Sequence, residues 1–353
     1  MSNCKCIFDN VDIVYSIGDI HGDFQTFKKI LFDIGSDPLI AYDQIFSVYT
    51  KNIYGCAFEL CRINKNNIKN DNFCIIQCGD LLYSAFKKVK TSDNEELRLL
   101  IFVLSLINSF NIISTVEKSY KSRYIQLLGN HDILILSSNS YSCLEDSLKK
   151  LNYFKTFYHH KKALWKLKNA LYENGLIFCK INDILYTHCF FDSKSNEFLF
   201  QESQYFKSQN KKNFNYSDNR FKRLNSQKDS KNENITIYNI IIKCMISDYN
   251  ELNLDVDSVK DIFIKDLRYF NKNLIDDKLD EYTIKQELNT YFGCNKVIMG
   301  HMYSPYYKEY LNGTIKIIDI GISQKIIQKY NLKRNFEIFY CCLCKNNICL
   351  VQK

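Results

Sequence analysis

Three short apolar runs in the N-terminal third of the chain each end at a glycine that is followed by polar residues. The runs are DIVYSI (12–17), FCIIQC (73–78) and YIQLL (124–128). Short, mostly apolar runs that stop at glycine are typical of strands buried in a sheet. We therefore predict three strands, each with polar residues directly after its end.

Helical spacing separates these predicted strands. Residues 24–34 carry apolar side chains on one helical face, and Gly35 follows as a stop signal. The apolar stretch 97–110 predicts a second helix, for which Ser92 and Glu95 form a capping box. This stretch is too short to span a bilayer, so we expect no membrane partner. Strands that alternate with helices predict a parallel sheet, whose sites gather at the carboxyl ends of its strands.

The second half of the chain carries more varied patterns. Residues 142–173 are predicted to be helical, and residues 176–189 to form a hairpin that turns at Asn182 and Asp183. KVIMGH (296–301) predicts a further strand that ends in Gly-His. The strand-end pattern of the first half is therefore repeated in the second.

Charge and composition mark one segment as different from the rest. Residues 193–234 are rich in Asn, Lys and Ser and are interpreted as a partly flexible insertion. The segment from Lys207 to Lys231 contains eight Lys or Arg and two Asp, so it accounts for +6 of the net charge of +8. The remaining chain is close to balanced, and we do not expect nucleic acid as a partner. We expect one domain over 1–353, with a terminal β-hairpin at about 336–352.

Cysteine usage bears on the compartment. The 15 cysteines are an odd number scattered along a chain without an evident secretion signal, which favours reduced thiols and a cytoplasmic location. Four of them crowd the terminal hairpin CCLCKNNIC, but no CxxC pair is present. We interpret them as core thiols rather than a zinc site. Trp165, the single tryptophan, is also expected in the core.

The histidines are unevenly placed. Of the six, four come directly after short apolar runs and their Gly or Thr: His21, His131, His188 and His301. Asp19, Asp80 and Asn130 occupy the same kind of position. One such residue is more often a turn former or a satisfied polar group. Five such clusters in one chain indicate a shared site.

Imidazole, carboxylate and side-chain amide form a recognisable ligand set. Together they suit Mn, Fe or Zn better than Ca, which prefers cages made of oxygen atoms. Two ions that lie about 3.5 to 4 Å apart in a dinuclear site need a shared carboxylate. Side chains two positions apart in extended backbone point the same way, so Asp19 and His21 can bind one ion from one side.

Five motifs occur in the order and context of the calcineurin-like metallophosphoesterases: GDIHGD, GD in QCGDLL, LLGNHD, YTHC and MGH. The chain most resembles the branch that contains the serine/threonine phosphoprotein phosphatases and the Shewanella-like bacterial phosphatases. GTIKIIDIGIS is also similar to the strand pair that follows the last motif there. The resemblance spans about residues 13–325 without the insertion. It implies an α/β fold of two mixed β-sheets packed as a sandwich, flanked by helices, with the site at the strand ends.

The resemblance also implies roles. The implied metal ligands are Asp19, His21, Asp80, Asn130, His188 and His301. Asp19 and His21 would bind the first ion, Asp80 would bridge both ions, and the other three would complete the second. His131 would protonate the leaving oxygen. The implied cofactors are two divalent transition-metal ions, with Mn favoured and Fe or Zn as alternatives, and the implied partner is a phosphorylated substrate such as a phosphoprotein.

The second motif departs from the family pattern Gly-Asp-x-Val-Asp-Arg-Gly. Tyr83 and Ser84 stand where the branch has the Asp that orients the protonating His and the Arg that clamps phosphate. Arg220 and Arg223 in the insertion are candidate substrate-binding replacements, and the alternative for them is a solvated loop. The third motif ends in Asp132, where the branch has Glu.

Three functions stay open on this reading. The leading one is a metal-dependent phosphomonoesterase of the serine/threonine protein phosphatase type. The second is a hydrolase of dinucleoside polyphosphates or other phosphodiesters, because the residues of the pocket walls come from variable loops. The third is a metal-binding scaffold with weak catalysis, which Tyr83 and Ser84 favour and the complete ligand set opposes.

Overall fold

The computed structural model describes most of the chain outside the insertion. The described residues are 5–53, 55–82, 95–137, 157–190, 195–197, 199–201, 203–204, 234–239, 242–243, 279–302, 307–319, 339–344 and 347–352. Tyr83, Ser84, Ser92, Arg220 and Arg223 lie outside them. The predicted capping box, the altered end of the second motif and the candidate phosphate clamp therefore stay predictions.

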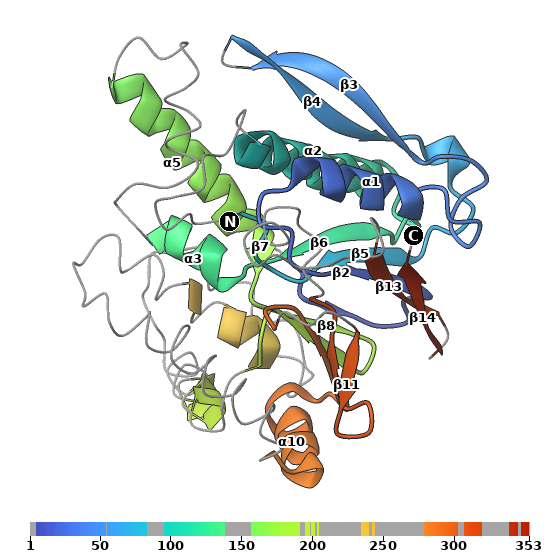
Figure 1. Cartoon of the computed structure of the whole chain (residues 1–353), viewed down its shortest axis with the longest axis vertical. Helices are drawn as coiled ribbons and strands as arrows, with labels where there is room; N and C mark the ends of the chain where they lie inside the picture. The colour runs from blue at the N-terminus through green and yellow to red at the C-terminus, as the bar shows by residue number, and fades with distance from the viewer. Residues whose placement is uncertain are drawn as a thin grey trace.

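Two six-stranded mixed sheets make up the centre of the described structure (Figure 1). In spatial order, the first sheet is β14 (Asn347–Gln352), β13 (Phe339–Cys344), β2 (Ile13–Ile17), β5 (Phe73–Gln77), β6 (Arg123–Leu127) and β7 (Gly175–Leu176). The second is β1 (Ile7–Phe8), β8 (Phe178–Ile181), β9 (Ile184–Thr187), β10 (Lys296–Met299), β12 (Ile315–Ile317) and β11 (Lys308–Tyr310). The predicted mixed-sheet α/β fold is confirmed.

The three predicted N-terminal strands lie side by side and parallel in the first sheet. Ile13 to Ile17 pair in register with Phe73 to Gln77, and β5 pairs in the same way with β6. Every residue of β2 and β5 is buried, as expected for parallel strands that are covered on both faces. Tyr186 of β9 is fully buried, which raises the pKa of its hydroxyl, and Cys341 of β13 and Cys74 of β5 lie near enough to raise this pKa further, as expected for two sheets packed face to face. The carboxyl ends of β2, β5 and β6 consequently meet at one edge.

Two helices cover the first sheet. α1 (Phe24–Ile34) begins at Asp23, whose carboxylate accepts the Thr26 N–H at 3.0 Å, and it ends at Gly35 as predicted. α2 (Glu95–Val116) extends beyond the predicted 97–110 and is long and apolar enough to cross a membrane, by length and composition only. In this fold α2 packs against β6, α1 and β4 (Cys56–Ile63). Its apolar residues on several sides are explained by these neighbours.

A two-stranded hairpin was not predicted. β3 (Phe46–Ile53) pairs with β4 on the outer side of α1 and α2 (Figure 1). β4 buries Phe58, Leu60 and Cys61, whereas most of β3 is exposed. Only Phe46, the first residue of β3, is buried, so β3 has no alternation of buried and exposed positions. Its residues accordingly show no period of two from which a strand could be predicted.

The remaining helices are short or peripheral. Those with defined bounds among the described residues are α3 (Asn130–Ser137), α5 (Phe157–Asn174), α10 (Glu281–Glu287) with a following π-helical turn Leu288–Phe292, and the 3₁₀ turn Lys65–Asn67. α5 confirms the helix predicted at 142–173 over its described part. The expectation for Trp165 is wrong, because its side chain is 62% exposed. Ala163, Leu167 and Leu171 form the buried face of α5, and Trp165 lies off that face.

Both predicted hairpins are present. β8 and β9 turn at Asn182 and Asp183, and β13 and β14 pair antiparallel at the C-terminus. Cys341 and Cys342 are buried as predicted, whereas Cys349 is exposed. Every cysteine among the described residues is a free thiol.

Candidate metal centre

The predicted site residues lie where strands of both sheets end. Asp19 and His21 follow β2, Asp80 follows β5, and His188 and His301 follow β9 and β10. Asn130 and His131 open α3, directly after Gly129, which lies two residues beyond the end of β6. The structure thus brings together the seven residues that were predicted as metal ligands or as general acid.

Backbone hydrogen bonds join the loops that carry these residues. The Asp80 carbonyl accepts the N–H of Ile20 at 3.2 Å and of His21 at 2.8 Å, and the Leu81 carbonyl accepts the Gly22 N–H at 2.8 Å. A side-chain hydrogen bond adds the loop after β6, since Asp80 Oδ1 accepts the backbone N–H of His131 at 2.9 Å. The loops after β2, β5 and β6 therefore form one hydrogen-bonded unit.

Three of the predicted ligands have strained backbone. His21, Asp80 and His301 have φ of 50°, 48° and 62°, in the left-handed region that residues with a Cβ avoid. Each such residue costs on the order of 1 to 3 kcal/mol, and strain of this kind concentrates at functional sites. The backbone at these three residues adopts an unfavourable conformation, and this conformation sets the direction of their side chains.

Two glycines make room for the carboxylates. A Cβ on Gly129 would lie 2.1 Å from Asp80 Oδ1, and a Cβ on Gly300 would lie 2.3 Å from Asp19 Oδ1. Both distances are far below van der Waals contact, so any larger residue at either position must displace the backbone or the acid. The glycines before Asn130 and His301 therefore leave the space that the Asp80 and Asp19 carboxylates of other loops occupy.

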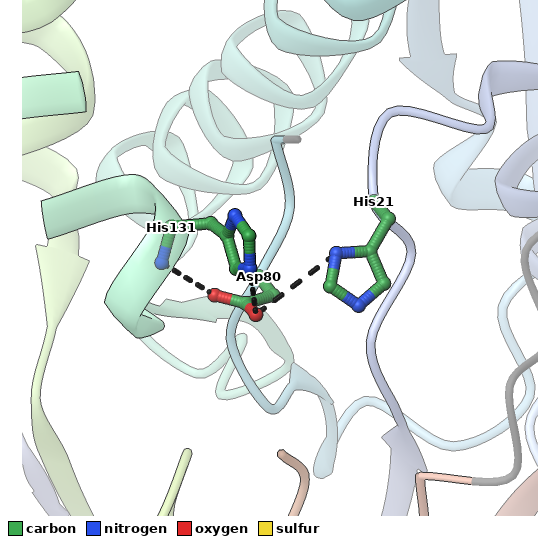
Figure 2. Close-up of side chains that lie close together, drawn as sticks. All are labelled: His21, Asp80 and His131. Carbon is green, nitrogen blue, oxygen red and sulfur yellow. Dashed lines mark hydrogen bonds and ion pairs between the residues drawn. The ribbon is translucent and has the colours of Figure 1, made fainter. Parts of the chain in front are cut away.

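One group of possible ligand atoms surrounds Asp80 on the side of the first sheet (Figure 2). Asp80 Oδ2 lies 3.9 Å from His21 Nδ1 and 3.8 Å from His131 Nε2. Asp19 Oδ2 lies 3.8 Å from His21 Nε2. We call His21, Asp80 and His131 the outer cluster, because the His131 side chain is 20% exposed.

A second group joins the two sheets and also contains Asp80. The possible ligand atoms of Asp80, His188 and His301 lie within 4.8 Å of one another, and we call these residues the inner cluster. His188 Nε2 lies 3.0 Å from both Asn130 Oδ1 and His301 Nδ1, and 3.6 Å from Asp80 Oδ1. The His301 backbone N–H donates to both carboxylate oxygens of Asp19 at 3.2 Å. Asp80 is the residue common to both clusters.

The donor chemistry of the inner cluster fits a cation. His188 Nδ1 lies 3.0 Å from the Cys78 carbonyl, which can only accept, so Nδ1 carries the proton and Nε2 presents a lone pair. That lone pair faces the amide oxygen of Asn130 and the carboxylate of Asp80. Burial lowers the pKa of His188, which keeps the imidazole in its neutral, ligating form.

The charge balance leads to the same conclusion. Asp19 and Asp80 are each 1% exposed, and burial raises the pKa of both carboxyls. The neighbouring carboxylate of Asp319, 4% exposed, raises both pKa values further. Buried acids that face one another are unfavourable as anions unless a cation lies between them. The residues present therefore fit divalent metal ions.

Two acids of this region were missed or undervalued in the sequence. Asp319 follows β12 and could have been found by the strand-end pattern that marked the other residues. Asp132 was noted only as a departure from Glu. Its fully buried carboxylate accepts the backbone N–H groups of Leu81, Leu82 and Gly129 at 3.1, 2.9 and 3.0 Å. Asp132 thus holds the loop after β5 against the loop after β6.

Known structures share this architecture. A cold-active protein tyrosine phosphatase has 14% sequence identity to the chain and a TM-score of 0.54, over 99% of this chain and 78% of that one. The cold-active protein-tyrosine phosphatase of a psychrophilic Shewanella species is similar at 13% identity and a TM-score of 0.54, over 99% and 80%. No model of a known protein family matches the sequence, and no curated protein matches it either.

The class of structure follows from the sheets and these neighbours. The chain has a metallophosphoesterase-like fold, and the resemblance that the motifs indicated is found again in its structural neighbours. At 13 to 14% identity the likeness establishes the fold alone.

Proposed function

We propose that the chain is a phosphoester hydrolase that depends on two divalent transition-metal ions, of the phosphomonoesterase type. The observation that carries this proposal is the position of Asp80, whose carboxylate belongs to both ligand clusters. A carboxylate shared in this way is what a dinuclear site requires. The fold of the phosphatase neighbours supports the same reaction class.

The ligands divide between the two ions as follows. Asp19 and His21 would hold one ion together with Asp80. The second ion would be held by the Asp80, Asn130, His188 and His301 side chains. Mn, Fe or Zn ions held there supply an activated water nucleophile at neutral pH and neutralise charge on the phosphoryl oxygens.

His131 is proposed as the general acid. Its ring lies edge-on to His21, with ring centroids 5.3 Å apart, and it is the most exposed of the three side chains in the outer cluster. The backbone N–H of His131 is fixed by Asp80, so the imidazole is anchored at the rim of the site. From there it can donate a proton to the departing oxygen of a phosphoester.

The preferred substrate is a phosphoprotein carrying phosphoserine or phosphothreonine. This choice rests on the motif resemblance to that branch. Arg220 or Arg223 would bind the phosphate, since Ser84 lacks the two charge-assisted hydrogen bonds of a guanidinium.

The test is turnover of p-nitrophenyl phosphate by metal-free protein to which Mn²⁺ is returned. We expect hydrolysis that rises with Mn²⁺ up to two ions per chain and that a chelator abolishes. Phosphoserine and phosphotyrosine peptides tested in parallel separate the substrate type from the reaction. A protein that binds two ions but hydrolyses neither phosphomonoesters, phosphodiesters nor dinucleoside polyphosphates would contradict the enzymatic proposal.

A further inference from the structure

Two buried glutamines lie beneath the loops that carry the predicted ligands. Gln77 and Gln126 are the last or nearly last residues of β5 and β6, and they are direct register partners in the parallel pair. They are 0% and 1% exposed, within strands that are otherwise almost entirely apolar. Burying an amide without partners costs about 1 to 3 kcal/mol, so a buried pair is expected to have specific hydrogen-bond partners.

The partners of Gln77 are the backbone of two ligand loops. Its Nε2 donates to the Gly18 carbonyl at 3.0 Å and to the Gly79 carbonyl at 2.5 Å. Its Oε1 accepts the Gly79 N–H at 3.1 Å. One side chain thus joins the end of β2, just before Asp19, to the end of β5, just before Asp80.

Gln126 and Tyr124 fix the orientation of the Gln77 side-chain amide. Gln126 Nε2 donates to Gln77 Oε1 and, at 2.7 Å, to the Leu127 carbonyl. The Tyr124 hydroxyl donates to Gln126 Oε1 at 2.9 Å, and its ring lies edge-on to Phe27 of α1. Backbone carbonyls can only accept, so each amide has one possible orientation. The result is a directed chain of hydrogen bonds from Tyr124 to the Gly18 and Gly79 carbonyls.

The turn that this chain holds is a strained one. Gly79 and Asp80 follow each other at φ of 97° and 48°, and the second conformation is unfavourable for a residue with a Cβ. Gln77 fixes the turn on one side of Asp80, and Asp132 fixes it on the other side through Leu81 and Leu82. Without Gln77, the Gly79 peptide directly before Asp80 loses the hydrogen bonds to its carbonyl and to its N–H, and a shift of this peptide turns the Asp80 carboxylate.

We propose that Gln77 and Gln126 are positioning residues that aim the Asp80 carboxylate at both metal clusters. This rests on the proposed dinuclear function, because Asp80 is the residue that both clusters share. The pair acts through backbone carbonyls and one N–H, and it touches neither substrate nor metal. Its effect is therefore on the affinity for both ions together, not for one of them.

The test is a Mn²⁺ titration of metal-free variants, followed by electron paramagnetic resonance. We expect Gln77→Met, which keeps the volume and removes the amide, to weaken the binding of both ions by about 10- to 100-fold, the scale for partners that orient metal ligands. Gln126→Met is expected to weaken it less, and Tyr124→Phe least. Gln44→Met is the matched control, since the Gln44 amide also bonds backbone, at Phe32 and Phe46, near the other end of α1.

A purely structural role predicts a different result. If Gln77 had only a structural role, Gln77→Met would lose thermal stability, as the control Gln44→Met is expected to, and would keep the wild-type Mn²⁺ affinity. That outcome would overturn the inference. Should Gln77→Met not fold, the volume-conserving Tyr124→Phe decides in the same assay. Hydrogen exchange of the Gly79 to Leu82 amides in metal-free protein is expected to accelerate in the variants.

The exchange measurement separates the two proposals. If the wild type binds no Mn²⁺, Fe²⁺ or Zn²⁺, the proposed function fails, while accelerated exchange in Gln77→Met still shows that Gln77 holds the turn. If the wild type binds two ions and Gln77→Met binds them equally well, the function stands and the positioning role fails.

Discussion

The two candidate metal-binding clusters are built differently although they share Asp80. The outer cluster takes its residues from loops of the first sheet alone, and its histidine side chains are 10% and 20% exposed. The inner cluster joins both sheets, and its His188 side chain is 3% exposed. His188 is fixed by the Cys78 carbonyl, whereas His131 is anchored through its backbone.

The difference indicates a division of roles. A buried imidazole with a fixed tautomer and a lowered pKa is suited to hold an ion permanently. A histidine at the rim can contact substrate and exchange protons with it. The inner cluster is therefore expected to secure the second ion, and the outer cluster to face the phosphoester.

Removal of the shared acid is expected to have the largest effect. Asp80→Asn should lose both ions, with a fall in Mn²⁺ affinity beyond the about 10- to 100-fold that follows loss of an outer partner. Elemental analysis of purified protein measures this directly. Asp43→Asn, at an exposed position, is the control. A variant that retains one tightly bound ion would show that Asp80 serves a single cluster.

A methyl group next to Asp80 is expected to act almost as strongly. Gly129→Ala places a Cβ 2.1 Å from Asp80 Oδ1 and 2.3 Å from its backbone N, so the turn has to move. We expect a loss of stability of about 1 to 3 kcal/mol, as for overpacking elsewhere, together with weakened binding of both ions. Gly35→Ala crowds Gln44 and Phe46 near the end of α1 and should cost stability without any loss of metal. Equal metal content in both variants would contradict the site geometry.

Substitution of His131 distinguishes the roles of the two clusters most clearly. His131→Asn is expected to keep both ions and to hydrolyse esters with poor leaving groups about 10²- to 10⁴-fold more slowly. Aryl esters, whose leaving groups need less protonation, should lose less activity. Kinetics with p-nitrophenyl phosphate and an alkyl phosphate measure the contrast. Loss of one ion in His131→Asn would instead make His131 a ligand of the outer cluster.

A smaller effect is expected from pH in the metal-free protein. Burial and the Asp80 charge raise the pKa of Asp132 from 3.8 to about 7. Between these two pH values the folded state keeps a proton that the unfolded state has released. The contribution of Asp132 to the free energy of unfolding is therefore full below pH 3.8. It falls as the pH rises from 3.8 to about 7, by about 1.4 kcal/mol per pH unit, and is lost above that pH. Thermal melts from pH 5 to 7 should show this fall, and Asp132→Asn should reduce it. A flat profile would contradict the raised pKa.

The sequence predicted which of the candidate residues lie together better than it predicted parts of the regular structure. Asp19, His21 and Asp80 were found because rare, chemically distinct residues repeat at strand ends, and the parallel register then brings them together. The hairpin β3–β4 was missed because β3 has almost no buried face from which a period could be read. Its strands are defined by pairing and by contact with α2, which no local pattern encodes.

Other misses have different physical origins. Gln77 and Gln126 look like isolated polar residues in apolar strands until the register places them side by side. Trp165 was expected in the core on hydrophobicity alone, whereas the helical period of α5 turns it away from Leu167 and Leu171. Asp319 could have been found, since it follows a strand as the predicted ligands do. Tertiary pairing decides the two glutamines, whereas local patterns were enough to place Trp165 and Asp319.

The most direct test of a shared Asp80 is the magnetic state of bound manganese. Metal-free wild type titrated with Mn²⁺ should bind two ions per chain, and its electron paramagnetic resonance spectrum should become that of an exchange-coupled pair, because one carboxylate links the ions. Binding of a single ion, or of two ions whose spectra stay those of isolated Mn²⁺, would contradict a site in which the outer and inner clusters share Asp80.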